Sequence, residues 1–547
     1  MNIPTKRILI VGGVAGGAAC AARLRRLDER AEILIFDRGP YVSFANCGLP
    51  YFVGGVIEDE KRLHVADETL FRERFNIHVH TCCNVVKIDR ENKRIEVCDL
   101  ATGSTRAERY DTLVLSPGSL PLRPPLSGID LPGIFTLRTI PDSRVIRQWI
   151  DESKATQAVV IGGGFIGLEM AENLAHRNLS ITVVEMLDQV MPPLDPEIAA
   201  YVEERLREHA VTLALGDGVA GFEPAPDGGL FVKTQSGITH RADIVILAIG
   251  VRPETTLAKS AALELGSRGG IRVDAQMRTS DPSIWAVGDA VEVKDWNIGH
   301  ETLLPLAGPA ARQGRIAADG ICGRASEFRG VQGTAICGVF GLQVAATGSS
   351  EKALIRAGDT DFEKVYLHPN QHAGYYPGAK QMHLKLLFRQ SNGEILGAQA
   401  VGDDGVDRRI DVIAMAIQKR GTVFDLEEAE LCYAPQFGGA KDAVNFAGMI
   451  AANLIRGDQP IAHWSEPTSP NTVFLDVRDP DEFQSGHAEG ARNIPVNHLR
   501  RRLAELRHDE EIRVYCAVGQ RGYLATRILV QNGFTARNLS GGWNSRA

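Results

Sequence analysis

Apolar residues along the chain form short continuous runs that end in glycine or an acid, a pattern typical of strands buried on both faces of a parallel sheet. The first runs are residues 7–11 (RILIV) and 32–37 (EILIFD), and an alanine-rich segment of helical character separates them. The same order of strand, helix and strand recurs around residues 158–161 and 181–184. Because strands that alternate with helices build βαβ units, this pattern predicts two α/β domains.

A glycine-rich loop follows the first strand of each predicted unit. Residues 12–17 read GGVAGG, residues 162–167 read GGGFIG, and the second strands end at Asp37 and Glu185. Such glycines allow backbone N–H groups to approach a pyrophosphate at a helix N-terminus, while the acid binds a ribose hydroxyl. Either loop alone could be an ordinary tight turn, but two complete units favour dinucleotide binding. Glu185 would repel the 2′-phosphate of NADPH, so NADH is favoured.

Length, composition and charge narrow the class of protein. The chain of 547 residues exceeds what one hydrophobic core supports, and no apolar stretch is long enough to predict a membrane helix. The net charge of −8 argues against nucleic acid as the main partner. Nine scattered cysteines suit a reducing compartment, and no signal segment precedes Arg7, so we expect a cytoplasmic protein with no membrane partner.

Three further segments extend the pattern: residues 113–118 (LVLSPG), 244–253 (IVILAIGVRP) and 280–290 (SDPSIWAVGDA). With the two glycine loops, they resemble the motifs of FAD-dependent pyridine nucleotide-disulfide oxidoreductases over about residues 5–455. In that family the aspartate that corresponds to Asp289, in the third segment, binds the ribityl chain of FAD. The resemblance implies an FAD site at Gly12, Val14, Ala15, Gly16, Gly17, Asp37, Ser43, Val85, Ser116, Gly118, Gly288 and Asp289, and an NADH site at Gly162, Gly164, Phe165, Ile166, Gly167, Glu185 and Gly250.

One cysteine stands in a short segment with glycine and proline close behind it, residues 43–50 (SFANCGLP). Gly48 and Pro50 place Cys47 in a turn, although an inert packing role is the alternative. A lone thiol cannot close an internal disulfide, so it must form a mixed disulfide with substrate or a sulfenic acid. The segment resembles the active site of coenzyme A disulfide reductases. We expect the nearby helix end and the flavin to lower the pKa of Cys47.

The same resemblance implies a coenzyme A site and a homodimer. Residues 431–445 (LCYAPQFGGAKDAVN) are similar to a family segment whose tyrosine, here Tyr433, reaches the partner subunit's Cys47 as a proton donor. Tyr375 or Tyr376 is similar to a second family tyrosine, and the choice stays open, as does an ordinary interface role. The implied coenzyme A residues, each of which could instead be a plain surface residue, are Ala19, Arg23, Arg26, Ser43, Asn46, Lys61, Arg62 and Lys441.

A separate C-terminal domain is predicted after residues 456–471, where Pro, Ser and Asp accumulate as in a linker. Residues 472–476 and 512–515 read as strands, and the second leads into Cys516, Ala517, Val518, Gly519, Gln520 and Arg521. Backbone N–H groups at such a strand-to-helix turn form an anion cradle, so Cys516 could hold a thiolate or persulfide with Arg521 as counter-charge.

The C-terminal segment resembles a single rhodanese domain, through LDVR at residues 475–478, GHAEGARNIP at 486–495, the Cys516 loop and GGW at 541–543. Two features depart from that family. Gly522 stands where many members have serine, and the chain stops four residues after Trp543. The resemblance implies sulfane sulfur transfer, and an inactive docking module is the alternative.

The predicted architecture is α/β, with two Rossmann-like domains, an α+β dimerisation domain and an α/β rhodanese domain. Electrons are expected to pass from NADH through FAD to Cys47, with small-molecule thiols, disulfides and persulfides, including those of coenzyme A, as substrates. The alternatives are an NADH peroxidase or oxidase and a non-catalytic, NAD-responsive adaptor; no metal site is predicted. The predicted ranges are 1–150 and 271–325 for FAD, 151–270 for NADH, 326–455 for dimerisation, 456–471 for the linker and 472–547 for rhodanese.

Overall fold

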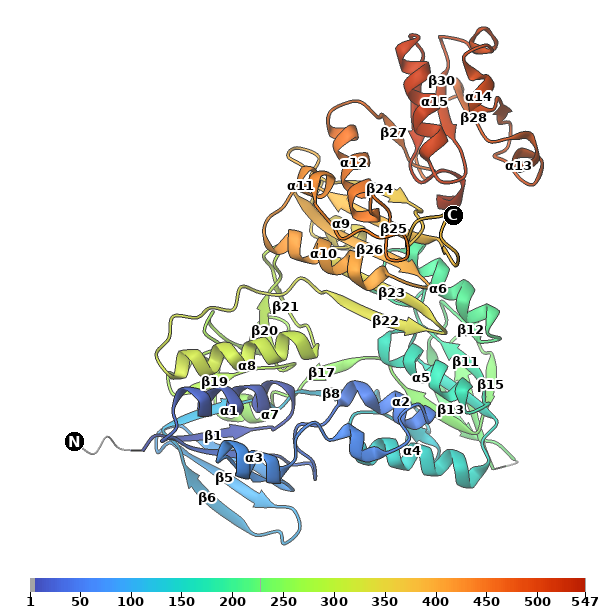
Figure 1. Cartoon of the computed structure of the whole chain (residues 1–547). Helices are drawn as coiled ribbons and strands as arrows, with labels where there is room; N and C mark the ends of the chain where they lie inside the picture. The colour runs from blue at the N-terminus through green and yellow to red at the C-terminus, as the bar shows by residue number, and fades with distance from the viewer. Residues whose placement is uncertain (1–4, 227, 547) are drawn as a thin grey trace. The chain divides into compact units, whose positions relative to one another are not determined.

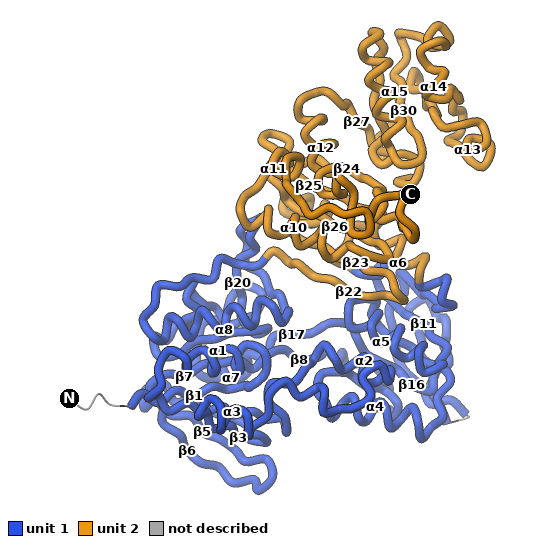
Figure 2. The backbone as a smooth tube through the Cα atoms, in the orientation of Figure 1, with its two compact units in different colours: residues 1–191, 206–331 blue, residues 192–205, 332–547 orange. Residues whose placement is uncertain are grey.

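The computed structural model describes residues 5–226 and 228–546. The chain divides into two compact units, Met1–Met191 with Leu206–Val331 and Pro192–Arg205 with Gln332–Ala547 (Figure 2). Within the described part of the chain, none of the helices combines the length and the apolar character that crossing a membrane requires.

The first unit contains a five-stranded parallel sheet around the first glycine loop. Helices α1 (Ala15–Leu27) and α8 (Ala307–Ile321) lie side by side over it (Figure 1). They approach so closely that a Cβ on Gly314 would lie 2.3 Å from the carbonyl oxygen of Gly16. The strand order is β19 (Ile284–Ala286), β7 (Thr112–Leu115), β1 (Arg7–Val11), β2 (Glu32–Phe36) and β3 (His78–His80).

A second five-stranded parallel sheet surrounds the second glycine loop. Helix α5 (Phe165–His176) follows its central strand, and α4 (Ile140–Ser153) precedes that strand in the chain. Its order is β12 (Thr212–Ala214), β11 (Ser180–Val184), β10 (Gln157–Ile161), β16 (Ile244–Leu247) and β9 (Ile134–Phe135). The predicted βαβ units are therefore confirmed, because in both sheets the strand after the glycine loop and helix pairs in parallel with the strand before them.

Smaller elements complete the first unit. Three short helices, η1 (Asn46–Gly48), α2 (Leu49–Gly54) and η2 (Glu60–Leu63), follow β2, and α3 (Glu68–Phe75) leads into β3. One antiparallel sheet consists of β4 (Cys83–Asp89), β5 (Arg94–Asp99) and β6 (Thr105–Arg109). A second consists of β13 (Val219–Pro224), β14 (Leu230–Thr234) and β15 (Thr239–Ala242). Strands β8 (Ser119–Pro121) and β17 (Val251–Pro253) form an antiparallel pair. The remaining elements are α7 (Thr256–Ser260), β18 (Ile271–Arg272), β20 (Val291–Lys294) and β21 (Glu301–Thr302).

The second unit opens with an antiparallel sheet whose central strands are almost fully buried. Helices pack on it, so this part is α+β as predicted. The order is β22 (Ala335–Val339), β23 (Leu342–Gly348), β26 (Ile395–Gly402), β25 (Met382–Phe388) and β24 (Glu363–Leu367). Helix α6 (Pro196–Glu208) belongs to this unit up to Arg205. The other helices of this part are α9 (Glu351–Arg356), α10 (Val406–Gln418), α11 (Val423–Glu428) and α12 (Ala443–Ile455).

A parallel five-stranded sheet forms the C-terminal part of the second unit, which agrees with the predicted α/β character. Its order is β27 (Ile461–Ala462), β31 (Thr535–Leu539), β30 (Glu511–Tyr515), β28 (Thr472–Asp476) and β29 (Arg492–Asn493). The accompanying helices are α13 (Pro480–Gln484), α14 (Val496–Leu499), η3 (Leu503–Glu505), α15 (Gln520–Gln531) and η4 (Gly542–Ser545).

The predicted linker, residues 456–471, is wrong in part. Its residues Ile461 and Ala462 form strand β27, which pairs with β31. Trp464 stacks on Phe474 and donates its indole N–H to the carbonyl oxygen of Gly542 at 2.8 Å. The accumulation of Pro and Ser concealed these contacts, because a two-residue edge strand leaves almost no hydrophobic pattern in a sequence.

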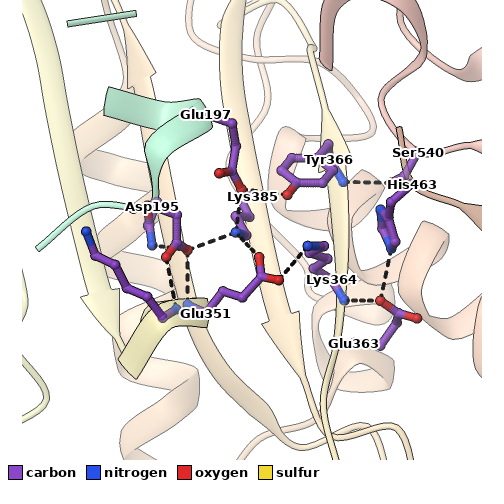
Figure 3. A network of polar contacts seen from close by, with 11 residues as sticks. Asp195, Glu197, Glu351, Glu363, Lys364, Tyr366, Lys385, His463 and Ser540 are labelled. Atoms are coloured by element: carbon purple, nitrogen blue, oxygen red, sulfur yellow. Dashed lines mark hydrogen bonds and ion pairs between the residues drawn. The ribbon is translucent and has the colours of Figure 1, made fainter. Parts of the chain in front are cut away.

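A buried ion cluster holds the antiparallel sheet to the segment that precedes α6 (Figure 3). Lys385, which is fully buried in β25, donates to Asp195 at 2.8 Å, Glu197 at 2.5 Å and Glu351 at 2.6 Å. Tyr366 donates its hydroxyl to Glu197 at 2.6 Å. A charge can be buried in this way only when opposite charges and hydrogen bonds compensate its lost hydration.

Candidate functional site

A pocket of about 730 Å³ in the first unit is lined by segments that are far apart in the sequence. The lining combines the first glycine loop, the end of β2, the turn after β7 and the turn after β19, so the predicted FAD segments meet in one place. The predicted residues that line it are Gly12, Val14, Ala15, Gly16, Asp37, Val85, Ser116, Gly118, Gly288 and Asp289, together with Asn46 and Cys47. Gly17 and Ser43 are not among the lining residues.

The geometry of the first loop explains its glycines. Gly12 has a φ of +93°, and a Cβ there would lie 2.1 Å from the carbonyl oxygen of Ser116. A Cβ on Gly17 would lie 1.9 Å from the carbonyl oxygen of Gly12, so Gly17 allows α1 to begin against the loop. Helix α1 has no acidic residue in its first turn and no side-chain cap. Its N-terminal N–H groups therefore suit a pyrophosphate.

Asp37 is fixed at the end of β2. Its carboxylate accepts hydrogen bonds from the backbone N–H groups of Gly13 and Gly39, both at 2.8 Å. Burial raises the pKa of Asp37, although these two hydrogen bonds act in the opposite direction. The acid thus ties the glycine loop to the strand end on the pocket wall, which is where a ribose would bind in this type of fold.

The second loop repeats this arrangement. Gly162 has a φ of +106°, and a Cβ on Gly167 would lie 1.9 Å from the carbonyl oxygen of Gly162. Glu185 accepts from the backbone N–H groups of Gly163 at 2.7 Å and Leu187 at 2.9 Å. Of the other predicted NADH residues, Gly164 precedes α5, Phe165 and Ile166 begin it, and Gly250 lies just before β17.

Cys47 lies in η1, in a tight turn immediately before α2, and its side chain is exposed at the pocket. The chain's own groups do not supply the low pKa that was expected from a helix end together with the flavin. Neighbouring protein atoms displace part of the thiol's hydration and raise its pKa, the charges of Glu169 and Asp289 add to this effect, and Arg138 acts against it. The chain's own groups therefore favour the thiol over the thiolate.

Arg138 is a pocket residue that sequence reasoning missed. Its guanidinium contacts the carboxylate of Asp289 at 3.3 Å, and Asp289 also accepts the hydroxyl hydrogen bond of Ser119 at 2.9 Å. The Asn46 amide donates to the backbone carbonyl of Arg138 at 3.2 Å. Only tertiary structure brings this arginine to the Cys47 turn, because it follows β9 and no motif marks it.

Glu169 is the second residue that was missed. It lies on α5, within reach of the Tyr51 hydroxyl at 3.5 Å, and α5 packs against α2. Burial raises the pKa of Glu169 to about 7, while the contact with Tyr51 has a smaller opposing effect. In the sequence its only signal is that it is the first charged residue in the apolar start of a helix.

The predicted coenzyme A residues differ in their surroundings. Arg23 is engaged in an ion pair with Asp319 at 2.8 Å, so its charge is already compensated. Ala19 lies against α8, where a Cβ on Gly314 would come within 3.2 Å of its methyl group. Ser43 donates its backbone N–H to the carbonyl oxygen of Gly13 at 2.9 Å. By contrast, the side chains of four cations are exposed to solvent: Arg26, Lys61, Arg62 and, in the second unit, Lys441.

Two of the predicted tyrosines meet in the second unit. The hydroxyl groups of Tyr375 and Tyr433 lie 2.8 Å apart, and both side chains are exposed. Tyr376 instead packs edge-on against His372, with ring centroids 5.5 Å apart. The sequence left the choice between Tyr375 and Tyr376 open, and the hydroxyl contact favours Tyr375 as the partner of Tyr433.

Cys516 lies directly after β30 and is 1% exposed. Helix α15 begins four residues later, again without an acidic residue in its first turn. The closing segment packs on the loop: Trp543 donates its backbone N–H to the carbonyl oxygen of Cys516 at 2.7 Å, and a Cβ on Gly542 would lie 2.3 Å from that oxygen. Residues 542 and 543 therefore pack directly on the backbone of Cys516.

The two notable residues after Cys516 have specific neighbours. Arg521 forms a bidentate ion pair with Glu482, at 2.6 and 2.7 Å, so the expected counter-charge for Cys516 is held by a carboxylate. Space for a side chain at Gly522 is restricted. A Cβ there would lie 2.3 Å from the amide oxygen of Asn538, whose Nδ2 donates to the carbonyl oxygen of Gly519 at 3.3 Å.

Models of known protein families match three consecutive parts of the chain. The model of the pyridine nucleotide-disulphide oxidoreductase family matches residues 6–314, that of its dimerisation domain matches residues 334–443, and that of the rhodanese-like domain matches residues 462–546. The chain is 34% identical over 450 residues to a coenzyme A disulfide reductase of Staphylococcus haemolyticus, which covers 82% of this chain and 100% of the relative.

Two solved structures are similar over almost the whole chain. The crystal structure of reduced Bacillus anthracis CoADR-RHD shares 46% identity and a TM-score of 0.97, covering 100% of this chain and 98% of that one. A NAD-dependent persulfide reductase from A. fulgidus shares 37% identity and a TM-score of 0.92, covering 99% and 100%. The chain therefore belongs to the pyridine nucleotide-disulphide oxidoreductase family, as a homologue of the coenzyme A disulfide reductases with a C-terminal rhodanese-like domain.

Proposed function

We propose that the protein uses NADH to reduce coenzyme A disulfide or coenzyme A persulfide through Cys47, and that its rhodanese-like domain supplies the sulfane sulfur. The observation that carries this proposal is that Cys47 lines the same pocket as the first glycine loop and Asp289. A thiol in that position would lie beside a flavin whose pyrophosphate occupies the loop. The relatives named above act on the same class of sulfur compound.

The residues of the pocket fit FAD. The glycines allow the loop to pack tightly at the N-terminus of α1, whose N–H groups suit a pyrophosphate, Asp37 lies close after β2 for a ribose, and Asp289 lines the same pocket beside Arg138. Bound FAD would supply two-electron chemistry between a nicotinamide and a disulfide. Glu185 would hold the adenine ribose of NADH at the second loop and disfavour the phosphate of NADPH.

Cys47 is the nucleophile in this proposal. Its thiolate attacks the coenzyme A sulfur of the persulfide, an S–S bond forms between Cys47 and coenzyme A, and hydrosulfide leaves. Two electrons that originate from NADH then cleave the mixed disulfide, which regenerates the Cys47 thiolate and releases coenzyme A as a thiolate that takes up a proton. Because the chain itself raises the pKa of Cys47, Arg138 is the side chain that supports the thiolate.

Proton donation is assigned to the tyrosine pair in a homodimer. The exposed hydroxyl of Tyr433 can reach a second subunit, and Tyr375 at 2.8 Å can replace the proton it gives up. Coenzyme A carries phosphates that need cations, and the exposed Arg26, Lys61 and Arg62 are the better candidates. Arg23 would first have to leave Asp319.

Sulfane sulfur enters at Cys516. A Cys516 persulfide would pass its outer sulfur to the coenzyme A thiolate, so that coenzyme A persulfide forms and the Cys516 thiolate is restored. The strand-to-helix turn between β30 and α15 provides backbone N–H groups for the anionic sulfur. The fused domain would thus produce the substrate that Cys47 consumes.

The test compares Cys47→Ser with Cys98→Ser, a control at a half-buried cysteine of β5. Cys47→Ser should keep flavin reduction by NADH in stopped flow but lose turnover of coenzyme A persulfide by about 10³-fold or more, because the nucleophile is gone. Unchanged turnover would refute the role of Cys47. Faster NADH consumption with peroxide would instead indicate a peroxidase, and a protein purified without flavin absorbance would favour an adaptor.

A further inference from the structure

We propose that the Cys516 loop takes sulfane sulfur from organic persulfides and discriminates against thiosulfate, because Glu482 neutralises the loop's cation. This inference rests on the proposed role of Cys516 as a sulfur carrier and names its donor. The loop is defined here as residues 516–521, and Arg521 is its charged side chain other than the thiol. A donor that brings two negative charges next to its sulfane sulfur would need more positive charge than the loop offers.

The Arg521 charge is committed to carboxylates. Both oxygens of Glu482 receive hydrogen bonds from the guanidinium, at 2.6 and 2.7 Å, and Asp479 lies 3.5 Å away. This fork-to-fork geometry is the strongest arrangement between an arginine and a carboxylate. Glu482 is itself held, because its side chain caps α13 by accepting the backbone N–H of Asp479 at 3.0 Å. The ion pair is therefore a built contact between α13 and the start of α15.

A second arginine of this domain, Arg478, is compensated as well. Arg478 is 4% exposed, and it contacts both oxygens of Asp476, one of them at 2.6 Å. It also donates to the carbonyl oxygen of Gly486 at 2.6 Å, and its guanidinium carbon lies 5.6 Å from the ring centroid of Tyr515 and 4.9 Å from that of Trp543. Such a residue stabilises the fold beneath the loop, and its charge is not available to a ligand.

Within the loop, the N-terminus of α15 adds a second source of positive potential. Residues 517–520 are neutral, so besides the Arg521 charge, which interacts with Cys516 but is offset by Glu482, the loop offers an anion the partial charge of its backbone N–H groups, roughly half an elementary charge. That charge suits one sulfur anion. Since Cys516 is 1% exposed, a dianion would also lose much of its hydration on reaching the thiol.

The two donor classes differ in where their charge lies. An organic persulfide reacts as Cys516–S⁻ plus R–S–SH, giving Cys516–S–SH and R–S⁻, so one negative charge is moved and any further charge on R stays distant. Thiosulfate reacts with the Cys516 thiol to give the same persulfide and sulfite, and both of its charges must enter the loop. Both reactions balance without an oxidant or reductant, and the loop's electrostatics favour the first.

The experiment measures single-turnover loading of Cys516 in the full-length flavoprotein by mass spectrometry of the Cys516 peptide. Glutathione persulfide and thiosulfate are compared at equal concentration. In the wild type, glutathione persulfide should load at least about ten-fold faster. In Glu482→Gln, which retains a side chain able to cap α13, thiosulfate loading should rise about ten-fold because one repelling charge is removed and Arg521 is released.

Two further variants separate charge from structure. Glu482→Asp keeps the negative charge, so its thiosulfate loading should stay low. Glu505→Gln removes a carboxylate of η3 that holds Arg502 in the same bidentate way, at 2.6 and 2.7 Å, and it should change neither donor's rate.

The outcomes distinguish this inference from the function on which it rests. If neither donor loads Cys516, the sulfur-carrier role itself fails. If thiosulfate loads the wild type as fast as glutathione persulfide, or if Glu482→Gln leaves the ratio of the two rates unchanged, the carrier role stands and the inference is refuted. The wild-type comparison decides on its own should Glu482→Gln fail to fold.

Discussion

Replacing Lys385 by methionine is the sharpest test of how the second unit is held together. Methionine is of similar length and fits a buried position, but the change removes the ammonium that Asp195, Glu197 and Glu351 share (Figure 3). Three carboxylates would then face one another in a site where the lysine has no exposure. The perturbation is therefore electrostatic rather than steric.

The expected loss is large. Removing one partner of a buried ion pair costs about 3–5 kcal/mol, because the remaining charge is left uncompensated. Other donors soften the effect, since Gln399 donates to Asp195 at 2.7 Å and Lys364 contacts Glu351 at 2.5 Å. At roughly 2–4 °C per kcal/mol for a domain of 150–250 residues, the apparent melting temperature of the second unit should fall by about 6–20 °C.

The pH dependence gives a second, independent readout. Burial alone would raise the pKa of Glu197 and Glu351, but Lys385 lowers both below the ordinary value. In the wild type this stabilisation is present at neutral pH and is lost as acid protonates the two groups. Without Lys385, burial and mutual repulsion raise both pKa values, so the variant should recover stability as the pH falls from about 7 to 5.

The assay is a thermal melt of wild type, Lys385→Met and Lys364→Met at several pH values. Lys364 is 15% exposed and contacts Glu351 alone of the three acids, so its replacement should cost much less and keep the wild-type pH trend. Two results would refute the reasoning: a Lys385→Met protein that melts with the wild type, or one whose deficit does not shrink toward acid pH. Either would show that the cluster contributes no net electrostatic stability.

Two further predictions concern the redox site. Glu169→Gln should make the Cys47 thiol react roughly two- to five-fold faster with iodoacetamide at about pH 8, because ionised Glu169 raises the pKa of Cys47. At about pH 6, where Glu169 is protonated, the substitution should change this rate little. An equal effect at both pH values would contradict this. Tyr433→Phe should lower kcat for coenzyme A persulfide by about 10²-fold and leave flavin reduction by NADH intact, whereas Tyr376→Phe should be nearly neutral.

The sequence predicted those parts of the protein in which local chemistry and position along the chain coincide. Glycine loops after buried strands indicated both dinucleotide units, and the structure gives the steric cause, since a Cβ at Gly17 or Gly167 would meet the preceding turn at 1.9 Å. Cys47 was singled out because its segment, residues 43–50, resembles a family active site and contains a single cysteine. Arg138 and Glu169 were missed because each is an ordinary charged residue until folding places it beside that turn.

The expectations about Cys47 and Arg521 share one limit. As far as the chain itself is concerned, both assigned an electrostatic environment from neighbours in sequence: a helix end, besides the flavin, for Cys47 and a loop arginine for Cys516. The structure adds charges from other elements, namely Glu169 and Asp289 around Cys47 and Glu482 against Arg521. A motif therefore indicates which thiol to examine, while its charged surroundings come from acids on distant segments. If the proposed roles of Cys47 and Cys516 hold, replacing Glu169 or Glu482 should change the behaviour of these thiols more than replacing the motif residues that flank them.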